Sequence, residues 1–581
     1  MNFHLKKLSK LGSAVLLIGL GVVILAACAK LPSLPDLQNL LGEVKLSPTE
    51  ARCAALIDAI KDPDFPVVNS RITVAKINAV SAGNEKEPAL PEHCLVQGIA
   101  GAYVGADKVR YGAGFELRLP LDWNGRFMFQ GGGGTEGTVP AAIGVAGTLS
   151  PTLAKGWAVV SQNGGHDNAV LIAAGKSTLD FLLEPRAFSE HASGSIDKTA
   201  RVARFLIRSF YGRLPDRSYH VGCSTGGRQG MVFSQQYPEY FDGIVAGDPV
   251  YDLTALTQGE VNSLQAIAAL TTKDAAGNAR FYEAFSIADQ NLATRAILDA
   301  CDAADGALDG IVNNLPACRF DPATHVFKNS GQPLQCTGAK TASCLSPAQV
   351  DAIKRINLGP RTSAGSPVVV PSGTRVEGYP YDGGFMAPNG IPVRNIGTAK
   401  APPGNINLGT NQIGYYIRPP TPRLEPYKSW NFNTDPAKIG KDLPIPALSA
   451  DLSAFKRRGG KMIFYHGVSD PGPSVHYTIN YFNRLAPLNS KDELAKLYLV
   501  PNMGHCRGGP APDQFDFLTP LVDWVERGIA PDTVIASGRN FASAPVARTH
   551  PLCAYPKIAR YTGLEGGNVG DAANFTCQIP N

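Results

Sequence analysis

A glycine-rich stretch around Ser224 has the spacing of a serine nucleophile. Gly222 and Gly226 flank the serine in the pattern Gly-x-Ser-x-Gly, between residues 216–219, which can enter a strand, and residues 230–237, which favour a helix. A side chain at either glycine would collide with the neighbouring strand or helix while the serine is held in a sharp turn. The pattern predicts a nucleophile elbow. The alternative is a glycine-rich turn that happens to contain a serine.

An acid and a histidine follow further along the chain, each at the end of an apolar segment. Residues 461–469 lead to Asp470, and residues 497–504 lead to His505. Open α/β sheets place reacting groups just past the carboxyl ends of their strands, and hydrolases of this kind order their triad serine, acid, histidine. We therefore expect His505 to take the proton of Ser224 while Asp470 fixes the histidine tautomer.

Three other histidines are alternatives to His505. His466 and His476 lie close in sequence to Asp470, and His166 follows a strand-like segment. Only His505 lies on a strand-end loop that is C-terminal to the acid, as the triad order requires. We therefore favour His505 and expect His466 to form local hydrogen bonds.

A serine nucleophile that attacks a carbonyl carbon also needs two N–H groups to hold the oxyanion. One should come from Thr225, the residue after the nucleophile, and the other from an earlier strand-to-helix loop. Residues 127–130 read as a strand and are followed by the four glycines 131–134. We select Gly132 as the second donor, although the sequence does not tell which glycine points inward. A flexible turn is the alternative.

Taken together, these motifs resemble those of the tannase and feruloyl esterase family of α/β-hydrolases. The stretches that carry the resemblance are residues 222–229, 466–470 and 501–506, and it extends from about residue 53 to residue 577. The resemblance implies an α/β-hydrolase fold with a large inserted lid subdomain. It also implies a serine carboxylic ester hydrolase that acts on esters of aromatic acids, such as feruloyl or galloyl esters, through an acyl-enzyme.

Cysteines adjoin both Ser224 and His505, and the family joins these two cysteines. Eleven cysteines less Cys28, which is assigned to lipidation below, leave an even number, as expected in an oxidising compartment. The spacing suggests three local disulfides, and the two cysteines that are then left over would form another. All of these pairs match the family's pattern. The expected disulfides are Cys53–Cys94, Cys223–Cys506, Cys301–Cys318, Cys336–Cys344 and Cys553–Cys577.

The N-terminus predicts an exported lipoprotein. Residues 1–27 combine three lysines with an apolar run that ends in small residues before Cys28. Acylation of Cys28 would hold the protein on a bacterial membrane, at the outer membrane or a periplasmic face, with residues 28–46 as a linker. A plain secretory signal, and a secreted protein, is the alternative. Removing the signal lowers the formal net charge from +5 to +2, which gives no indication of a nucleic-acid partner.

The remaining chain is interrupted by a long insertion. Residues 47–250 and 446–581 are expected to form the two parts of the hydrolase core, and Ser47 with Glu50 predicts a capping box at its first helix. Residues 251–445 are too long for a loop and are predicted to form the lid subdomain. The absence of internal repeats in the sequence argues against a scaffold role, and we expect a monomer.

Aspartates recur in the first half of the insertion, with glycines that permit tight turns. Hard oxygen ligands in flexible geometry suit Ca²⁺, although the spacing is not that of an EF-hand and a solvated acidic loop is the alternative. The family resemblance implies a structural calcium ion here. The expected ligands are Asp302, Asp305 and Asp309 and the carbonyl groups of Ala307 and Ile311.

The second half of the insertion, residues 360–445, is rich in aromatic residues that would cover the serine. One branch of the family hydrolyses the terephthalate monoester and uses a lid arginine to hold its free carboxylate. Residues 395–417 contain no arginine, and Thr225 fits the general family pattern. We therefore expect esters of aromatic acids, with polyester-derived or aliphatic monoesters as the alternative. A non-catalytic ligand-binding surface lipoprotein is a further alternative, which the intact Ser, Asp and His set argues against.

Overall fold

The computed structural model describes residues 47–580, apart from 84–87, 148–149, 445–446, 490, 539–547 and 565–566. The expected signal peptide, Cys28 and the linker lie outside the described residues. Among the residues that are described, no helix has both the length and the apolar character that crossing a membrane requires.

Among the described residues, 47–52 belong to one compact unit, and Cys53 to Pro580 form a second one. Helix α3 (Pro48–Ala54) begins with the expected capping box: the Ser47 N–H donates to Glu50 Oε2 at 2.7 Å, and the Glu50 N–H donates to Ser47 Oγ at 3.2 Å. These two bonds satisfy N–H groups that a helix start leaves without partners.

The second unit is built on a nine-stranded sheet with the order β1-β2-β3-β5-β4-β6-β7-β8-β9. The strands are β1 (Arg71–Asn78), β2 (His93–Val104), β3 (Arg110–Pro120), β4 (Arg126–Gln130), β5 (Ala158–Gln162), β6 (Arg217–Cys223), β7 (Gly243–Gly247), β8 (Lys461–Gly467) and β9 (Ala495–Val500). Strands β1, β2, β3 and β5 pair antiparallel, and β5, β4, β6, β7, β8 and β9 pair parallel. The parallel strands therefore bring the residues that follow them to one edge of the sheet.

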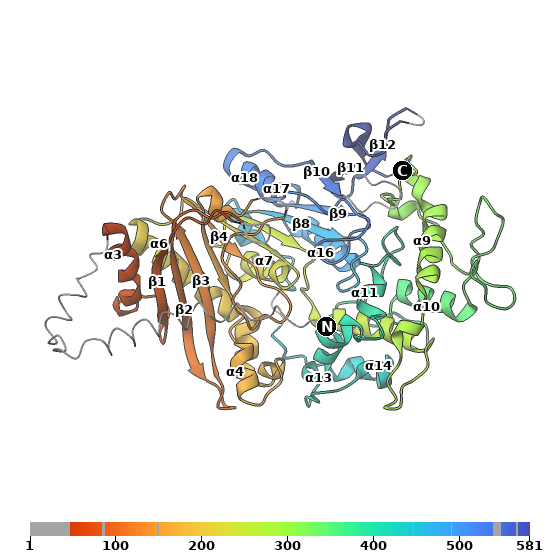
Figure 1. Ribbon diagram of the computed structural model, residues 1–581, viewed down its shortest axis with the longest axis horizontal. Coiled ribbons are helices and arrows are strands. Elements are labelled where there is room, and N and C mark those ends of the chain that lie inside the picture. The colour runs from red at the N-terminus through yellow and green to blue at the C-terminus, as the bar shows by residue number, and fades with distance from the viewer. Residues whose placement is uncertain are drawn as a thin grey trace, which may run out of the picture. The chain divides into compact units, whose positions relative to one another are not determined.

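Alternating apolar residues let the sheet bury both faces. Phe127 and Phe129 of β4 lie in one core with side chains of α6 (Ser195–Tyr211) and α7 (Thr225–Gln236). Met128, between them, lies in a second core with Trp524 of α18 (Leu518–Arg527). Because successive strand residues point to opposite faces, α6 and α7 cover one face and α18 covers the other (Figure 1).

Further elements flank these layers. They are η1 (Ala55–Lys61), η2 (Thr152–Lys155), α4 (Asn168–Ala173), η3 (Asp180–Leu183), α5 (Pro185–Ser189), η4 (Glu190–Gly194), α15 (Ser453–Arg457), α16 (Val475–Asn489) and α17 (Lys491–Leu494).

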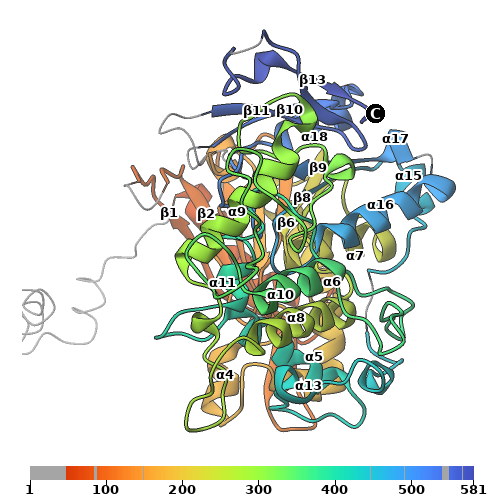
Figure 2. The same cartoon turned by 90° about the vertical axis from the view of Figure 1, so that its right-hand side faces the viewer.

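A long insertion separates β7 from β8, although these strands are neighbours in the sheet. It contains α8 (Leu253–Ala268), η5 (Phe281–Glu283), α9 (Ile287–Cys301), η6 (Asp302–Asp305), η7 (Leu315–Ala317), α10 (Pro347–Leu358), α11 (Ile391–Asn395), α12 (Gly404–Leu408), η8 (Thr410–Gln412), α13 (Ile413–Tyr416), α14 (Pro426–Ser429) and η9 (Asp435–Lys438). Figure 2 shows α8, α10 and α11 beside one another. Leu264 of α8 and Ile353 of α10 share a core that is distinct from the two cores of the sheet.

Most of the insertion's aromatic side chains are buried. Tyr379 and Phe385 lie in the insertion's own core. By contrast, the core that contains α6 and α7 also includes Tyr416, Trp430 and Phe432. The second half of the insertion therefore packs directly on the sheet's helical layer.

The chain ends in two antiparallel hairpins. They are formed by β10 (Thr533–Gly538) with β11 (Arg548–Cys553) and by β12 (Ile558–Tyr561) with β13 (Phe575–Gln578), which follows η10 (Ala572–Asn574). Sequence patterns had not indicated either hairpin. Ala307 of the aspartate-rich loop packs with Cys553 and Phe575, so the hairpins support that loop.

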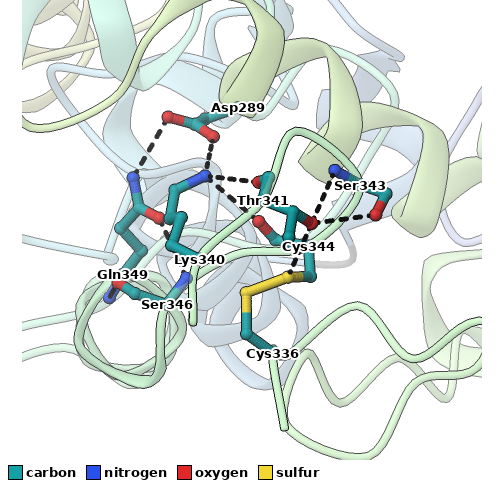
Figure 3. Close-up of a disulfide and its surroundings, with 8 residues drawn as sticks. All are labelled: Asp289, Cys336, Lys340, Thr341, Ser343, Cys344, Ser346 and Gln349. Atoms are coloured by element: carbon teal, nitrogen blue, oxygen red, sulfur yellow. Dashed lines mark hydrogen bonds and ion pairs between the residues drawn. A yellow bond between two sulfur atoms is a disulfide. The ribbon is translucent and has the colours of Figure 1, made fainter. Parts of the chain in front are cut away.

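The described part of the chain contains five disulfides, in the pairs expected above: Cys53–Cys94, Cys223–Cys506, Cys301–Cys318, Cys336–Cys344 and Cys553–Cys577. Figure 3 shows Cys336–Cys344, which closes a short loop of the insertion. Lys340 in this loop donates to Asp289 Oδ1 at 2.6 Å and to the Cys344 carbonyl at 3.1 Å. Asp289 also forms the capping box of α9, so the loop is fixed to the start of that helix.

Candidate active site

Ser224 lies in a strained turn between β6 and α7. Its φ of 64° and ψ of −122° are outside the regions that non-glycine residues normally adopt. A Cβ on Gly222 would lie 2.6 Å from the backbone carbon of Gly226, and one on Gly226 would lie 2.8 Å from the Gly132 carbonyl oxygen. The two glycines of the motif are therefore required by close backbone approach, as the elbow interpretation predicted.

The structure brings Ser224, His505 and Asp470 together from three separate loops at the sheet edge. His505 Nε2 is 2.8 Å from Ser224 Oγ, and His505 Nδ1 is 2.6 Å from Asp470 Oδ2. These distances suit a serine hydroxyl that donates to the imidazole and an imidazole that donates to the carboxylate. The arrangement can remove the serine proton and stabilise the resulting imidazolium.

Asp470 is completely buried after β8. Burial alone would raise the pKa of its carboxyl, but the adjoining His505, with further help from His466, holds that pKa well below its usual range. The Gly472 N–H donates to the other carboxylate oxygen, Oδ1, at 2.8 Å. Asp470 is therefore held as an acceptor in a fixed orientation.

The alternative histidines have other environments. His466 Nδ1 is 2.7 Å from Thr478 Oγ1 and its Nε2 is 2.9 Å from the Pro473 carbonyl, so it bonds locally, as expected. His166 stacks on Phe181 with 3.8 Å between the ring centroids. Burial lowers the pKa of His166 to about 4, which keeps its ring neutral near pH 7.

Asp248 is a buried acid beside the triad that the sequence patterns did not reveal. It follows β7 with a φ of 38°, and its Oδ1 accepts a hydrogen bond from the Gly467 N–H at 2.9 Å. Burial raises the pKa of Asp248 to about 7, and the Asp470 charge adds to the increase, while His466 opposes it. Its position past the carboxyl end of a core strand was the available signal. Ligand atoms of Asp248, Asp470 and His505 lie within 4.8 Å of one another, but both ring nitrogens of His505 already have partners.

The glycine loop after β4 approaches the first turn of α7. Thr225 Oγ1 donates to the Gly134 carbonyl at 2.5 Å. The Gly132 N–H donates to Gln229 Oε1 at 3.0 Å, while the N–H groups of Thr225 and Gly133 have no acceptor among the described residues. The loop thus lies where oxyanion donors are needed, and the role of Gly132 itself stays a prediction.

The aspartate-rich loop contains three buried carboxylates, those of Asp302, Asp305 and Asp309. Asp302 and Asp305 accept hydrogen bonds from nearby backbone N–H groups, but Asp309 Oδ2 is buried without a partner among the described residues. Burial, with repulsion from neighbouring aspartates, raises the pKa of Asp305 to about 6 and that of Asp309 to about 8. Such a donor set fits an oxygen-preferring cation.

Comparison with known proteins agrees with the fold. A solved structure of feruloyl esterase B from Aspergillus oryzae is 22% identical, with a TM-score of 0.70, and the match covers 91% of this chain and all of that one. A second, an esterase from the same organism, is 23% identical with a TM-score of 0.70. The chain has the α/β-hydrolase fold.

Sequence comparison assigns the family. The family model for tannase and feruloyl esterase matches residues 99–578. The chain is 40% identical to mono(2-hydroxyethyl) terephthalate hydrolase of Piscinibacter sakaiensis, over 92% of each chain. It is 31% identical to a probable feruloyl esterase of Arthroderma benhamiae, over 79% of this chain and 81% of that one. The chain belongs to the tannase and feruloyl esterase family and is a carboxylic ester hydrolase of that family.

Proposed function

We propose that this protein hydrolyses esters of aromatic acids with Ser224, His505 and Asp470 as its catalytic triad. The observation that carries the proposal is the imidazole of His505, which bridges Ser224 Oγ at 2.8 Å and the buried Asp470 carboxylate at 2.6 Å. An intact bridge at the end of a strained elbow is difficult to explain by packing alone.

In the proposed reaction, Ser224 Oγ attacks the ester carbonyl carbon while its proton passes to His505 Nε2. The N–H of Thr225 and one from the glycine loop hold the oxyanion. The sequence points to Gly132, but its N–H donates to Gln229 in the structure, so the neighbouring Gly133 N–H is the alternative donor. When the intermediate collapses, the bond to the alcohol breaks and His505 returns the proton to the leaving oxygen. Water then attacks the acyl-enzyme with His505 as base, which releases the acid and restores Ser224.

The acyl group is proposed from the relatives and from the insertion. Both the feruloyl esterases and the terephthalate monoester hydrolase carry names that denote esters of aromatic acids. The 40% identity to the terephthalate enzyme favours a second candidate, hydrolysis of a polyester-derived monoester. The lack of an arginine in residues 395–417 favours the first, because a free carboxylate would lack that partner.

A substrate panel separates these candidates. We would compare methyl ferulate, methyl gallate, the terephthalate monoester and p-nitrophenyl acetate, using the wild type and Ser224→Ala. We expect the wild type alone to cleave them, with the uncharged aromatic esters at higher kcat/KM than the terephthalate monoester. A higher kcat/KM for the terephthalate monoester would support the second candidate, and no turnover by a folded wild type would contradict both.

We also propose that the aspartate-rich loop holds a structural Ca²⁺ through Asp302, Asp305 and Asp309 and the carbonyls of Ala307 and Ile311. The unpartnered Asp309 Oδ2 supports this, because a bound cation would offset the charge of buried carboxylates. Adding CaCl₂ after chelation should raise the Tm of the wild type but not that of Asp309→Asn. An equal Tm with chelator and with calcium would contradict the site.

Export, lipid attachment at Cys28 and a monomeric state complete the proposal. The five disulfides support an oxidising compartment. Mass spectrometry of the N-terminal peptide from the bacterial membrane should detect an acylated Cys28 that Cys28→Ser lacks. An unmodified N-terminus cleaved at another residue would support a plain secretory signal instead.

A further inference from the structure

A buried carboxylate lies directly behind the glycine loop. We propose that Glu136 is a positioning residue: through Gln229 it holds the glycine loop in register with the nucleophile helix, so that the oxyanion donors face the ester. The inference rests on the proposed function, because it assigns a task to the loop that this function uses.

The hydrogen bonds run in two arms that meet at Glu136. In the first arm, the Gly132 N–H donates to Gln229 Oε1 at 3.0 Å, and Gln229 Nε2 donates to Glu136 Oε1 at 2.5 Å. In the second arm, the Gly164 N–H donates to Gln162 Oε1, and Gln162 Nε2 donates to Glu136 Oε2, the latter at 2.5 Å. Only the first arm includes the glycine loop.

The direction of each bond is fixed by the backbone. A backbone N–H can only donate, so the oxygen of each glutamine amide must face its glycine and the NH₂ group must face Glu136. Glu136 therefore has to accept on both oxygens at once. A carboxylate can do this and a glutamine side chain cannot, which gives a chemical reason for a glutamate at this buried position.

The surroundings show that this position is built around the acid. Gln162 and Gln229 are each 1% exposed, and Glu136 is buried and has a φ of 57°, a conformation that is uncommon outside glycine. Its carbonyl accepts from Asn168 Nδ2 at 3.1 Å, which helps to hold that conformation. Burial raises the pKa of Glu136 to about 8, while the charge of the buried Arg228 and the bonds from Gln162 and Gln229 oppose the increase. The carboxylate form, which accepts on both oxygens, therefore predominates above about pH 8.

The glycine loop contacts this carboxylate directly. A Cβ on Gly132 would lie 2.6 Å from the carboxylate carbon of Glu136. Gln229 lies one helical turn after Thr225 on α7, and Thr225 Oγ1 binds the Gly134 carbonyl at 2.5 Å. The loop and the helix are therefore joined at two points, Gly132 with Gln229 and Gly134 with Thr225, one on each side of the Gly133 amide. Glu136 fixes the first of these points through its bond to Gln229.

A pair of single variants and their combination tests this arrangement. In Glu136→Gln, the NH₂ groups of Gln162 and Gln229 both face an amide that has only one accepting oxygen. In Gln229→Glu, the carboxylate of Glu136 faces a second carboxylate, and neither can donate. The double variant Glu136→Gln/Gln229→Glu restores the order of donors and acceptors, because the new carboxylate accepts from both Gly132 and the new amide.

We expect each single change to lower kcat for p-nitrophenyl acetate by about 10- to 100-fold with little change in KM, since an oxyanion hole acts on the transition state. The double variant should recover to within about threefold of the wild type, because it has the same number of satisfied donors.

The second arm provides the matched control. Gln162→Met and Gln229→Met each remove one bond to Glu136, but only Gln229 binds the glycine loop. We expect similar losses of Tm and a large loss of kcat in Gln229→Met alone. Equal kcat losses in the two methionine variants would overturn the inference, and so would a double variant that does not recover. If Glu136→Gln does not fold, the comparison of the two methionine variants decides. Ser224→Ala separates this from the proposed function: if it abolishes turnover while all network variants keep full kcat, only the positioning role fails.

Discussion

Two regions of this protein bury carboxylates, and they differ in how the negative charge is balanced. Asp470 accepts hydrogen bonds from His505 and from the Gly472 N–H. Burial would raise the pKa of Asp470, but His505, with His466, holds it below the usual range. Asp309 has an unpartnered oxygen among the described residues, and burial with the adjacent aspartates raises its pKa to about 8. The triad region therefore supplies its own hydrogen-bond donors, whereas the aspartate-rich loop leaves one carboxylate oxygen for the cation that we propose it binds.

The largest expected effect comes from changing one acid in each region. Asp470→Asn should lower kcat by about 10⁴-fold, because an amide favours the wrong histidine tautomer. Asp309→Asn should leave kcat within about twofold, since Asp309 takes no part in the hydrogen bonds that join Ser224, His505 and Asp470. Initial rates with methyl ferulate at saturation would measure both. A comparable loss in Asp309→Asn at unchanged Tm would contradict the division between the regions.

Disulfides sharpen the same comparison. Cys223→Ala/Cys506→Ala removes the bond beside both Ser224 and His505, and Cys301→Ala/Cys318→Ala removes the bond at the aspartate-rich loop. Each pair should cost about 2–5 kcal/mol in the free energy of unfolding. Only the first should also lower kcat, by about 10-fold or more, because small displacements of catalytic groups are costly. Denaturant unfolding and steady-state kinetics would measure this, and an equal kcat for both pairs would show that the first bond does not position the triad.

A smaller effect concerns acid stability of the region around the elbow. His220 is buried, its Nε2 is 2.9 Å from the Gly226 carbonyl, and burial lowers its pKa to about 4. Between about pH 6.5 and 4 the unfolded chain binds a proton that the folded protein does not, so stability falls as the pH is lowered through that window. Thermal unfolding across this range should show a shallower pH dependence for His220→Asn than for the wild type. An identical slope would mean that His220 is not the group responsible.

Local patterns in the sequence were sufficient for the elbow and for the strand-end positions of Asp470 and His505. These features depend on a short motif and on apolar strands whose ends meet at one sheet edge, so they can be predicted without knowing the packing. The α/β-hydrolase fold was predicted from the family resemblance that these motifs carry, and it is confirmed. The disulfide pairs came from the family resemblance, since spacing alone leaves many connectivities open.

Other parts of the site could not be predicted from local patterns. Glu136, Gln162 and Gln229 come from three distant segments, and only their packing shows that they form one network. The direction of the Gly132 N–H depends on Gln229 for the same reason. The strands of the C-terminal hairpins are only four to six residues long, so their sequence periodicity is weak.

The most direct test of the account is covalent labelling of the nucleophile. A fluorophosphonate reacts with an activated serine, and mass spectrometry identifies the modified peptide. We expect one adduct, on Ser224, in the wild type, much slower labelling in His505→Ala, and none in Ser224→Ala, which should also have lost ester hydrolysis. An adduct on another residue, or undiminished hydrolysis by Ser224→Ala, would contradict the assignment of Ser224 as the nucleophile.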